Sequence, residues 1–117
     1  MLPTHAIIGL AGLSLLVTQP VQAAPCWKAE TIGAARLREL DVMLMTVMLR
    51  CENKGFKLRE TFDRFSVANK RAIQTADGAL KAHYGADKNK AGKVEYDQYL
   101  TGLANHYGSG YTDVKTC

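Results

Sequence analysis

The chain contains no proline after Pro25, and beyond that point its apolar residues recur at intervals of three and four. Proline is the residue that most strongly excludes helix, whereas a repeat of three and four places apolar side chains along one face of a helix. No segment alternates apolar and polar residues over a length typical of a strand. The sequence therefore predicts an all-α fold.

Three helices are expected from this spacing, covering about residues 31–50, 58–84 and 94–107. Gly85 and Gly108 follow the second and third repeats, and glycine commonly ends a helix because it accepts the left-handed conformation. The connections are short, which favours helices that are antiparallel to their neighbours. We therefore expect a small up-down-up three-helix bundle.

Asn69 lies on the apolar seam of the second predicted helix. A polar residue at such a position either fixes the packing register through a buried hydrogen bond or turns towards the edge of the helix. The sequence leaves both interpretations open.

The first residues have the features of a secretory signal peptide. Residues 6–17 form an uncharged apolar stretch, shorter than the roughly 20 residues that a membrane-spanning helix needs. Val21, Gln22 and Ala23 follow it and offer small residues at the two positions that a signal peptidase reads. We expect residues 1–23 to be removed, and residues 24–117 to form one periplasmic or secreted domain with no stable membrane span.

The formal net charge of +4 is spread along the chain rather than gathered in one run. Nucleic-acid-binding domains usually cluster their basic residues. In the densest basic stretch, residues 54–71, the run of lysines and arginines is interrupted by Glu60 and Asp63. This pattern indicates a solvated helix face, and no nucleic-acid partner is expected.

Residues 42–49 place apolar side chains on every side of the first predicted helix, because only Thr46 among them is polar. Two neighbouring helices leave part of such a helix uncovered. Methionine is favoured on surfaces that adapt to more than one shape. We expect a further contact there, made by the tail of residues 109–117, by a second copy of the chain, or by a partner protein or apolar ligand. The candidate contact residues are Val42, Met43, Met45, Met48 and Leu49.

The chain contains three cysteines, Cys26, Cys51 and Cys117, and cysteines of secreted proteins usually pair. Cys26 and Cys51 lie near opposite ends of the first helix, about 30 Å apart. The Cα atoms of a disulfide lie within about 7 Å. In an up-down-up bundle the third helix and its tail end near Cys51, so Cys51–Cys117 is the first choice and Cys26–Cys117 the alternative. One thiol is left over.

Residues 87–98 resemble an EF-hand calcium loop between two helices. Asp87 and Asn89 match its first and third positions, Gly92 its turn glycine and Glu95 its ninth position. The resemblance implies a calcium site built from Asp87, Asn89, Lys93, Glu95 and Gln98.

The same stretch departs from the EF-hand pattern at two ligands. Ala91 stands at the fifth position and Gln98 replaces the bidentate acid at the twelfth. Three lysines also bring positive charge beside the loop. A solvated turn without a metal is therefore the favoured interpretation.

No serine lies in a nucleophile elbow, and neither a zincin pattern nor a phosphate loop is present. We expect a binding protein rather than an enzyme, with no cofactor, acting through the apolar side of the first helix on a partner protein or a second copy. The alternatives are a degenerate calcium-binding domain at residues 87–98, and a small periplasmic enzyme or metal carrier.

Overall fold

The computed structural model describes residues 26–108 and Cys117. These residues form four helices and no strand, so the predicted all-α class is confirmed and the predicted number of helices is wrong. The predicted signal peptide and residues 109–116 of the tail lie outside the described residues. The helices are α1 (Ala29–Glu52), α2 (Arg59–Ala68), α3 (Lys70–Tyr84) and α4 (Lys90–Gly108).

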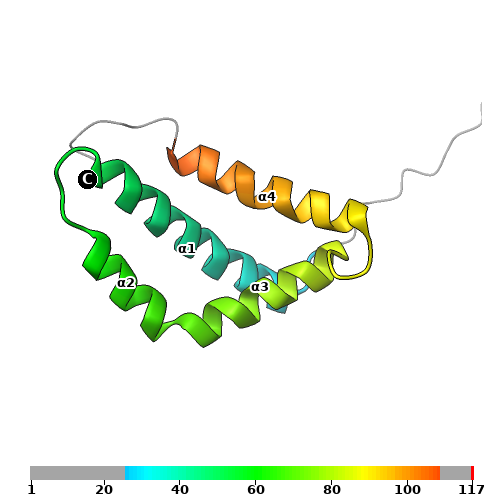
Figure 1. Ribbon diagram of the computed structural model, residues 1–117. Helices are drawn as coiled ribbons and strands as arrows, with labels where there is room; N and C mark the ends of the chain where they lie inside the picture. The colour runs from blue at the N-terminus through cyan, green and yellow to red at the C-terminus, as the bar shows by residue number, and fades with distance from the viewer. Residues whose placement is uncertain (1–25, 109–116) are drawn as a thin grey trace, which may run out of the picture.

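α1 is the central element of the fold (Figure 1). α4 lies along one side of it, and α2 and α3 lie along another, bent relative to each other where they meet. α3 packs on both α1 and α4, whereas α2 makes its main contacts with α1. The fold is therefore tightly assembled at the α3 end and more open at the α2 end.

The predicted single helix over residues 58–84 is interrupted at Asn69. The backbone of Asn69 leaves the helical region (φ −109°, ψ 9°), and its side-chain Nδ2 donates a 2.8 Å hydrogen bond to the carbonyl oxygen of Phe65. An asparagine that satisfies backbone groups with its own side chain competes with the helix. Asn69 thus acts locally, as the joint between α2 and α3.

α4 begins at Lys90, earlier than predicted, because the connection from α3 is a tight turn. Gly85 ends α3 in the left-handed conformation (φ +69°), as its position in the sequence indicates. The Asn89 side-chain Oδ1 then accepts a 2.7 Å hydrogen bond from the Gly92 backbone N–H, which caps the first turn of α4. A Cβ on Gly92 would overlap the carbonyl group of Gly85 and the carbonyl oxygen of Tyr84, so only glycine fits there.

The main buried cluster joins α1, α3 and α4. It consists of Ala34, Ala76, Leu80 and Tyr96. Trp27, just before α1, closes this end by packing on His83 with ring centroids 4.5 Å apart. α2 contributes no buried residue. Because apolar burial is the main source of folding free energy, the stability of the domain resides mainly outside α2.

Candidate interaction surface

The chain's own helices cover only part of the apolar surface of α1. Val42 and Met48 are each 4% exposed, so in this structure both are buried within the fold and offer a partner little surface. Met43 is half-buried. Met45 and Leu49 are 39% and 47% exposed and remain accessible. Among the described residues, α1 therefore keeps some accessible apolar surface, but less than its sequence indicates.

An apolar groove separates the C-terminal half of α1 from α2; we call it the α1–α2 groove. Its volume is about 300 Å³, and of its seven lining residues only Thr61 is polar. The rings of Phe62 and Phe65 lie 6.4 Å apart and form part of its α2 side. The lining residues are Leu44, Val47, Met48, Leu58, Thr61, Phe62 and Phe65.

The groove arises from the break at Asn69. Phe62 and Phe65 are three residues apart on α2, and Leu58, the N-cap residue, stands four residues before Phe62. All three therefore lie on the side of α2 that is turned to α1. That face is half-buried at best, whereas Val67 on the outside of α2 is 77% exposed. The bend carries α2 along a different line from α3, and the facing side chains leave space between the helices.

A second depression lies at the bend itself, between the N-terminal half of α1 and residues 68–79; we call it the elbow groove. Its volume is about 580 Å³. More than half of its lining residues are alanine or glycine, among them Gly33 on α1 and Ala72 and Ala76 on α3. Small side chains leave the space between the two helices unfilled.

Both grooves lie along one face of α1. Gly33 and Leu37 line the elbow groove, and Leu44 and Val47 line the α1–α2 groove. Their spacings of four, seven and three place them on the same side of the helix. Gly33 and Val47 are fourteen positions apart, which is about 21 Å along a helix. Leu40 lies between them and is 39% exposed, so apolar surface is accessible between the two grooves.

The surface around α2 is basic. Residues 52–71 hold six basic and three acidic side chains and therefore carry +3 of the net +4 charge. One of the three acids, Glu52, forms an ion pair with Arg59, with nitrogen and oxygen 2.8 Å apart. The six basic side chains are all exposed: Lys54, Lys57, Arg59, Arg64, Lys70 and Arg71.

A polar network at the opposite end of the fold joins three helices. The Asp77 carboxylate of α3 accepts a hydrogen bond from the Tyr96 hydroxyl. It also forms an ion pair with Lys81, whose Nζ lies 2.9 Å away. Arg38 of α1 lies 3.6 Å from the same carboxylate and pairs with Asp41 at 2.5 Å. These partners all belong to the chain itself, so the network ties helices together.

The environment of the network shifts two pKa values in opposite directions. Burial alone raises the pKa of Asp77, but hydrogen bonds from Tyr96 and Lys81 outweigh it and leave this pKa below its usual value. Burial, together with the hydrogen bond to Asp77, raises the pKa of Tyr96 to about 12. At neutral pH the pair is therefore a carboxylate accepting from a neutral phenol.

The residues that resemble a calcium loop do not form one. Lys93, Glu95 and Gln98 lie within α4 and are exposed to solvent. Asp87 lies in the preceding turn, and Asn89 uses its side-chain oxygen to cap α4. Gly92 lies in α4, where it allows close packing against the Tyr84 and Gly85 backbone. Within residues 26–108 and Cys117, no group of three or more His, Cys, Asp or Glu residues is placed to hold a metal ion.

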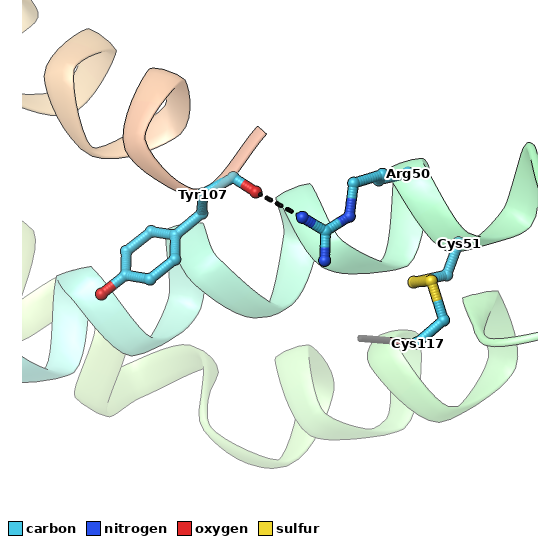
Figure 2. Close-up of a disulfide and its surroundings, with 4 residues drawn as sticks. All are labelled: Arg50, Cys51, Tyr107 and Cys117. Carbon is cyan, nitrogen blue, oxygen red and sulfur yellow. Dashed lines mark hydrogen bonds between the residues drawn. A yellow bond between two sulfur atoms is a disulfide. The ribbon is translucent and has the colours of Figure 1, made fainter. Parts of the chain in front are cut away.

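The predicted disulfide joins Cys51 to Cys117, with Cα atoms 5.6 Å apart. Cys51 is fully buried at the end of α1. Figure 2 shows that its neighbour Arg50 reaches the end of α4, where its Nη1 donates a 3.1 Å hydrogen bond to the Tyr107 carbonyl oxygen. The leftover thiol is that of Cys26, which is exposed. The alternative pairing of Cys26 with Cys117 is therefore wrong.

Sequence reasoning missed the α1–α2 groove, because it predicted one unbroken helix over residues 58–84. The signal that could have located it is Asn69, the polar residue that interrupts the apolar seam. In the described part of the chain, no helix combines the length and the apolar character needed to cross a membrane. Comparison of the chain with protein-family models, with curated proteins and with solved structures gave no match.

Proposed function

We propose that the protein is a small binding module that holds an amphipathic helix of a partner protein in the α1–α2 groove. The observation that carries this proposal is the groove itself, which has a volume of about 300 Å³ and is lined by apolar side chains apart from Thr61. Accessible apolar surface of this kind is typical of sites that contact another macromolecule or an apolar ligand.

The shape of the surface favours a helix over a compact small molecule. The two grooves and Leu40 follow one face of α1 over about 21 Å, which matches the apolar face of a helix of about four turns. Helix-in-groove recognition uses apolar anchors at spacings of three and four residues. Leu44, Val47 and Phe62 would contact such anchors, and the small side chains of the elbow groove would allow a close approach.

The charge around α2 favours an acidic partner. Residues 52–71 carry a net charge of +3, and Lys57 and Arg64 are both exposed. Charges at the rim of an interface mainly set partner choice and the rate of association. We infer that the partner helix carries aspartate or glutamate on the flanks of its apolar face.

We place this activity in the periplasm or outside the cell, with residues 1–23 removed as a signal peptide. The Cys51–Cys117 disulfide supports this location, because disulfides persist in oxidising compartments. Binding rather than catalysis is supported by the Asp77 network, whose charged groups are engaged with one another. We assign the domain to the up-down-up class, with α2 and α3 as its bent middle helix. Sequencing the amino terminus of the exported protein tests the leader: the expected first residue is Ala24.

Site-specific photo-crosslinking tests the binding site. A benzoylphenylalanine replaces Thr61 inside the groove or, as the matched control, Val67 on the outer side of the same helix. Irradiation in the native extracellular or periplasmic fraction is expected to crosslink position 61, and not position 67, to one peptide. That peptide should have apolar residues at spacings of three and four, flanked by acidic residues.

The other possible occupants give different products in the same experiment. Crosslinks between light and isotopically heavy copies of the chain would show self-association in place of a partner helix. A small apolar molecule retained in native mass spectrometry would show a ligand site. Equal crosslinking at positions 61 and 67 would contradict the proposed groove.

The charge argument has its own test, once the crosslinked peptide is synthesised. Arg64→Glu on α2 is expected to weaken binding of that peptide, and added salt should reduce the difference between the variant and the parent protein. Lys88→Glu, in the turn between α3 and α4, is the control and should leave the affinity unchanged. Equal effects of the two substitutions would show that only net charge matters.

A further inference from the structure

α2 is attached to the rest of the fold more weakly than any other helix. It has no buried residue, and its main contacts are with α1 alone. α1, α3 and α4 share the cluster of Ala34, Leu80 and Tyr96 and the ion pairs around Asp77. Segments with few buried apolar contacts open at a lower free energy than the core does.

Both ends of α2 depart from regular helix geometry. At its C-terminal end, Asn69 has non-helical backbone angles and separates α2 from α3 by a single residue. At its N-terminal end, residues 53–58 are non-helical and include Gly55 with a φ of +92°. A change in backbone angles at these few positions would move α2 without altering α1 or α3.

The contact between α2 and α1 is incomplete. Phe62 and Phe65 line a groove of about 300 Å³ instead of packing against α1 without a gap, and atoms beside such space lose part of their dispersion contacts. A polar contact between the two helices is the Arg59–Glu52 ion pair at 2.8 Å, in which the Arg59 side chain is 58% exposed. Exposed ion pairs of this kind stabilise weakly.

We propose that α2 is a hinged arm that opens about Asn69 while α1, α3 and α4 stay folded, and that this opening admits an occupant to the α1–α2 groove. That the opening lets an occupant enter the groove rests on the function proposed above, whereas the opening itself is a property of the free protein. In the open state α2 exposes Leu44, Val47 and Met48 of α1. Closing returns Phe62 and Phe65 to the opposite side of the groove.

Hydrogen–deuterium exchange of the full secreted chain, read by mass spectrometry of peptides, tests the opening. The amides of residues 59–68 are expected to exchange at least about tenfold faster than those of residues 76–82 and 96–103, with little dependence on low denaturant concentrations. Trp27 is the only tryptophan in the sequence and packs on His83, away from α2. Its fluorescence should therefore not change in the conditions in which α2 exchanges.

Two substitutions on α2 separate hinged opening from general destabilisation. Phe65→Ala removes a contact to the groove and should speed exchange of residues 59–68 several-fold, while exchange in α3 and α4 stays the same. Val67→Ala, on the exposed side of the same helix, should change neither the exchange of residues 59–68 nor that of α3 and α4. If α2 exchanged at the same rate as α3 and α4, or only when Trp27 fluorescence reports unfolding, the hinged arm would be refuted.

The outcomes for the arm and for the binding site are distinguishable. Fast local exchange of α2 without specific crosslinks from position 61 would leave the arm standing and refute the partner site. Specific crosslinks from position 61 together with equal exchange rates in all helices would support the partner site and refute the arm. With both confirmed, the synthetic partner peptide should slow exchange of residues 59–68 selectively, and an equal slowing of all helices would contradict a role of the arm in admission.

Discussion

The hydroxyl of Tyr96 on α4 donates a hydrogen bond to the carboxylate of Asp77 on α3, while the ring of Tyr96 belongs to the buried cluster. One side chain thus supplies both apolar burial and a charge-assisted bond between two helices. Arg38 of α1 lies beside the same carboxylate, so all three core helices meet at Asp77. Bonds to a charged acceptor are stronger than bonds between neutral groups.

The Tyr96 hydroxyl is expected to stabilise the fold measurably. Tyr96→Phe keeps the ring and removes the donor, so the free energy of unfolding should fall by about 1–3 kcal/mol. Chemical denaturation followed by the fluorescence of Trp27 measures the change. Tyr99→Phe removes a hydroxyl from the same aromatic group and is the control, with a smaller expected effect. An equal loss in both variants would contradict the special role of the bond to Asp77.

The lowered pKa of Asp77 predicts an acid-dependent loss of stability. Its folded-state pKa lies below the unfolded value of 3.8, so its ionisation stabilises the fold at pH values above 3.8. That contribution is lost as the pH falls through the folded-state pKa. The difference in Tm between the parent protein and Asp77→Asn should therefore be largest near neutral pH and shrink below pH 3.8. A difference that does not depend on pH would contradict this.

The raised pKa of Tyr96 predicts the opposite behaviour in base. Its folded-state pKa is about 12, against an ordinary value of 10.0, so the folded state holds the phenol proton more tightly. The corresponding stability is fully present below pH 10 and is lost as the pH rises towards 12. Tyr96→Phe should lose less stability than the parent protein over that interval. Absorbance of ionised tyrosine during alkaline titration checks the assignment.

Two glycines of α4 should respond oppositely to the same substitution. A Cβ at Gly92 would overlap the Tyr84 and Gly85 backbone, whereas nothing lies within 4 Å of a Cβ at Gly102. Gly92→Ala should destabilise the fold by about 1–3 kcal/mol, because the start of α4 must move away from α3. Gly102→Ala should stabilise it by about 0.5–1 kcal/mol. Thermal denaturation compares the two, and similar effects would contradict the close approach at Gly92.

The Cys51–Cys117 disulfide closes a loop with a sequence separation of 66 residues. On chain-entropy grounds, its loss should cost about 4 kcal/mol of stability. Cys117→Ser is the informative variant because Cys51 is fully buried and a serine there would disturb the packing as well. Cys26→Ser should leave stability unchanged. If reduction of the parent protein lowered Tm no more than Cys26→Ser does, the tether would be energetically unimportant.

The sequence predicts the helical class, the first helix and the disulfide because each follows from a local feature of the sequence. Apolar spacing places α1, and the distance along a helix excludes the pairing of Cys26 with Cys51. The turn at Gly85 follows from glycine's access to positive φ. These features could be derived without knowing how the helices pack.

The break at Asn69 and the α1–α2 groove could not be derived in this way. The repeat of three and four continues through residues 58–84. A break of one residue that keeps the apolar side chains on the same face leaves this repeat unchanged, so the repeat cannot reveal the break. The stretch of residues 86–93 is polar for two different reasons: its first half is a turn, and its second half is the first turn of α4, in which all residues but Gly92 are exposed. Hydropathy alone does not distinguish a polar turn from a polar first turn of a helix.

The unequal burial of the methionines of α1 predicts that lysine is tolerated at one of them and not at another. Met45 is 39% exposed and Met48 is 4% exposed, although they are three residues apart. Met45→Lys should change the free energy of unfolding by less than about 1 kcal/mol, because the ammonium group can reach water. Met48→Lys buries a charge beside the α1–α2 groove. It should therefore lower the free energy of unfolding by about 3 kcal/mol, the upper end of the usual range for point substitutions. Denaturation of both variants, with light scattering to follow self-association, measures the contrast. Severe destabilisation by Met45→Lys would mean that this side of α1 is covered in solution, by a second copy or by another part of the chain.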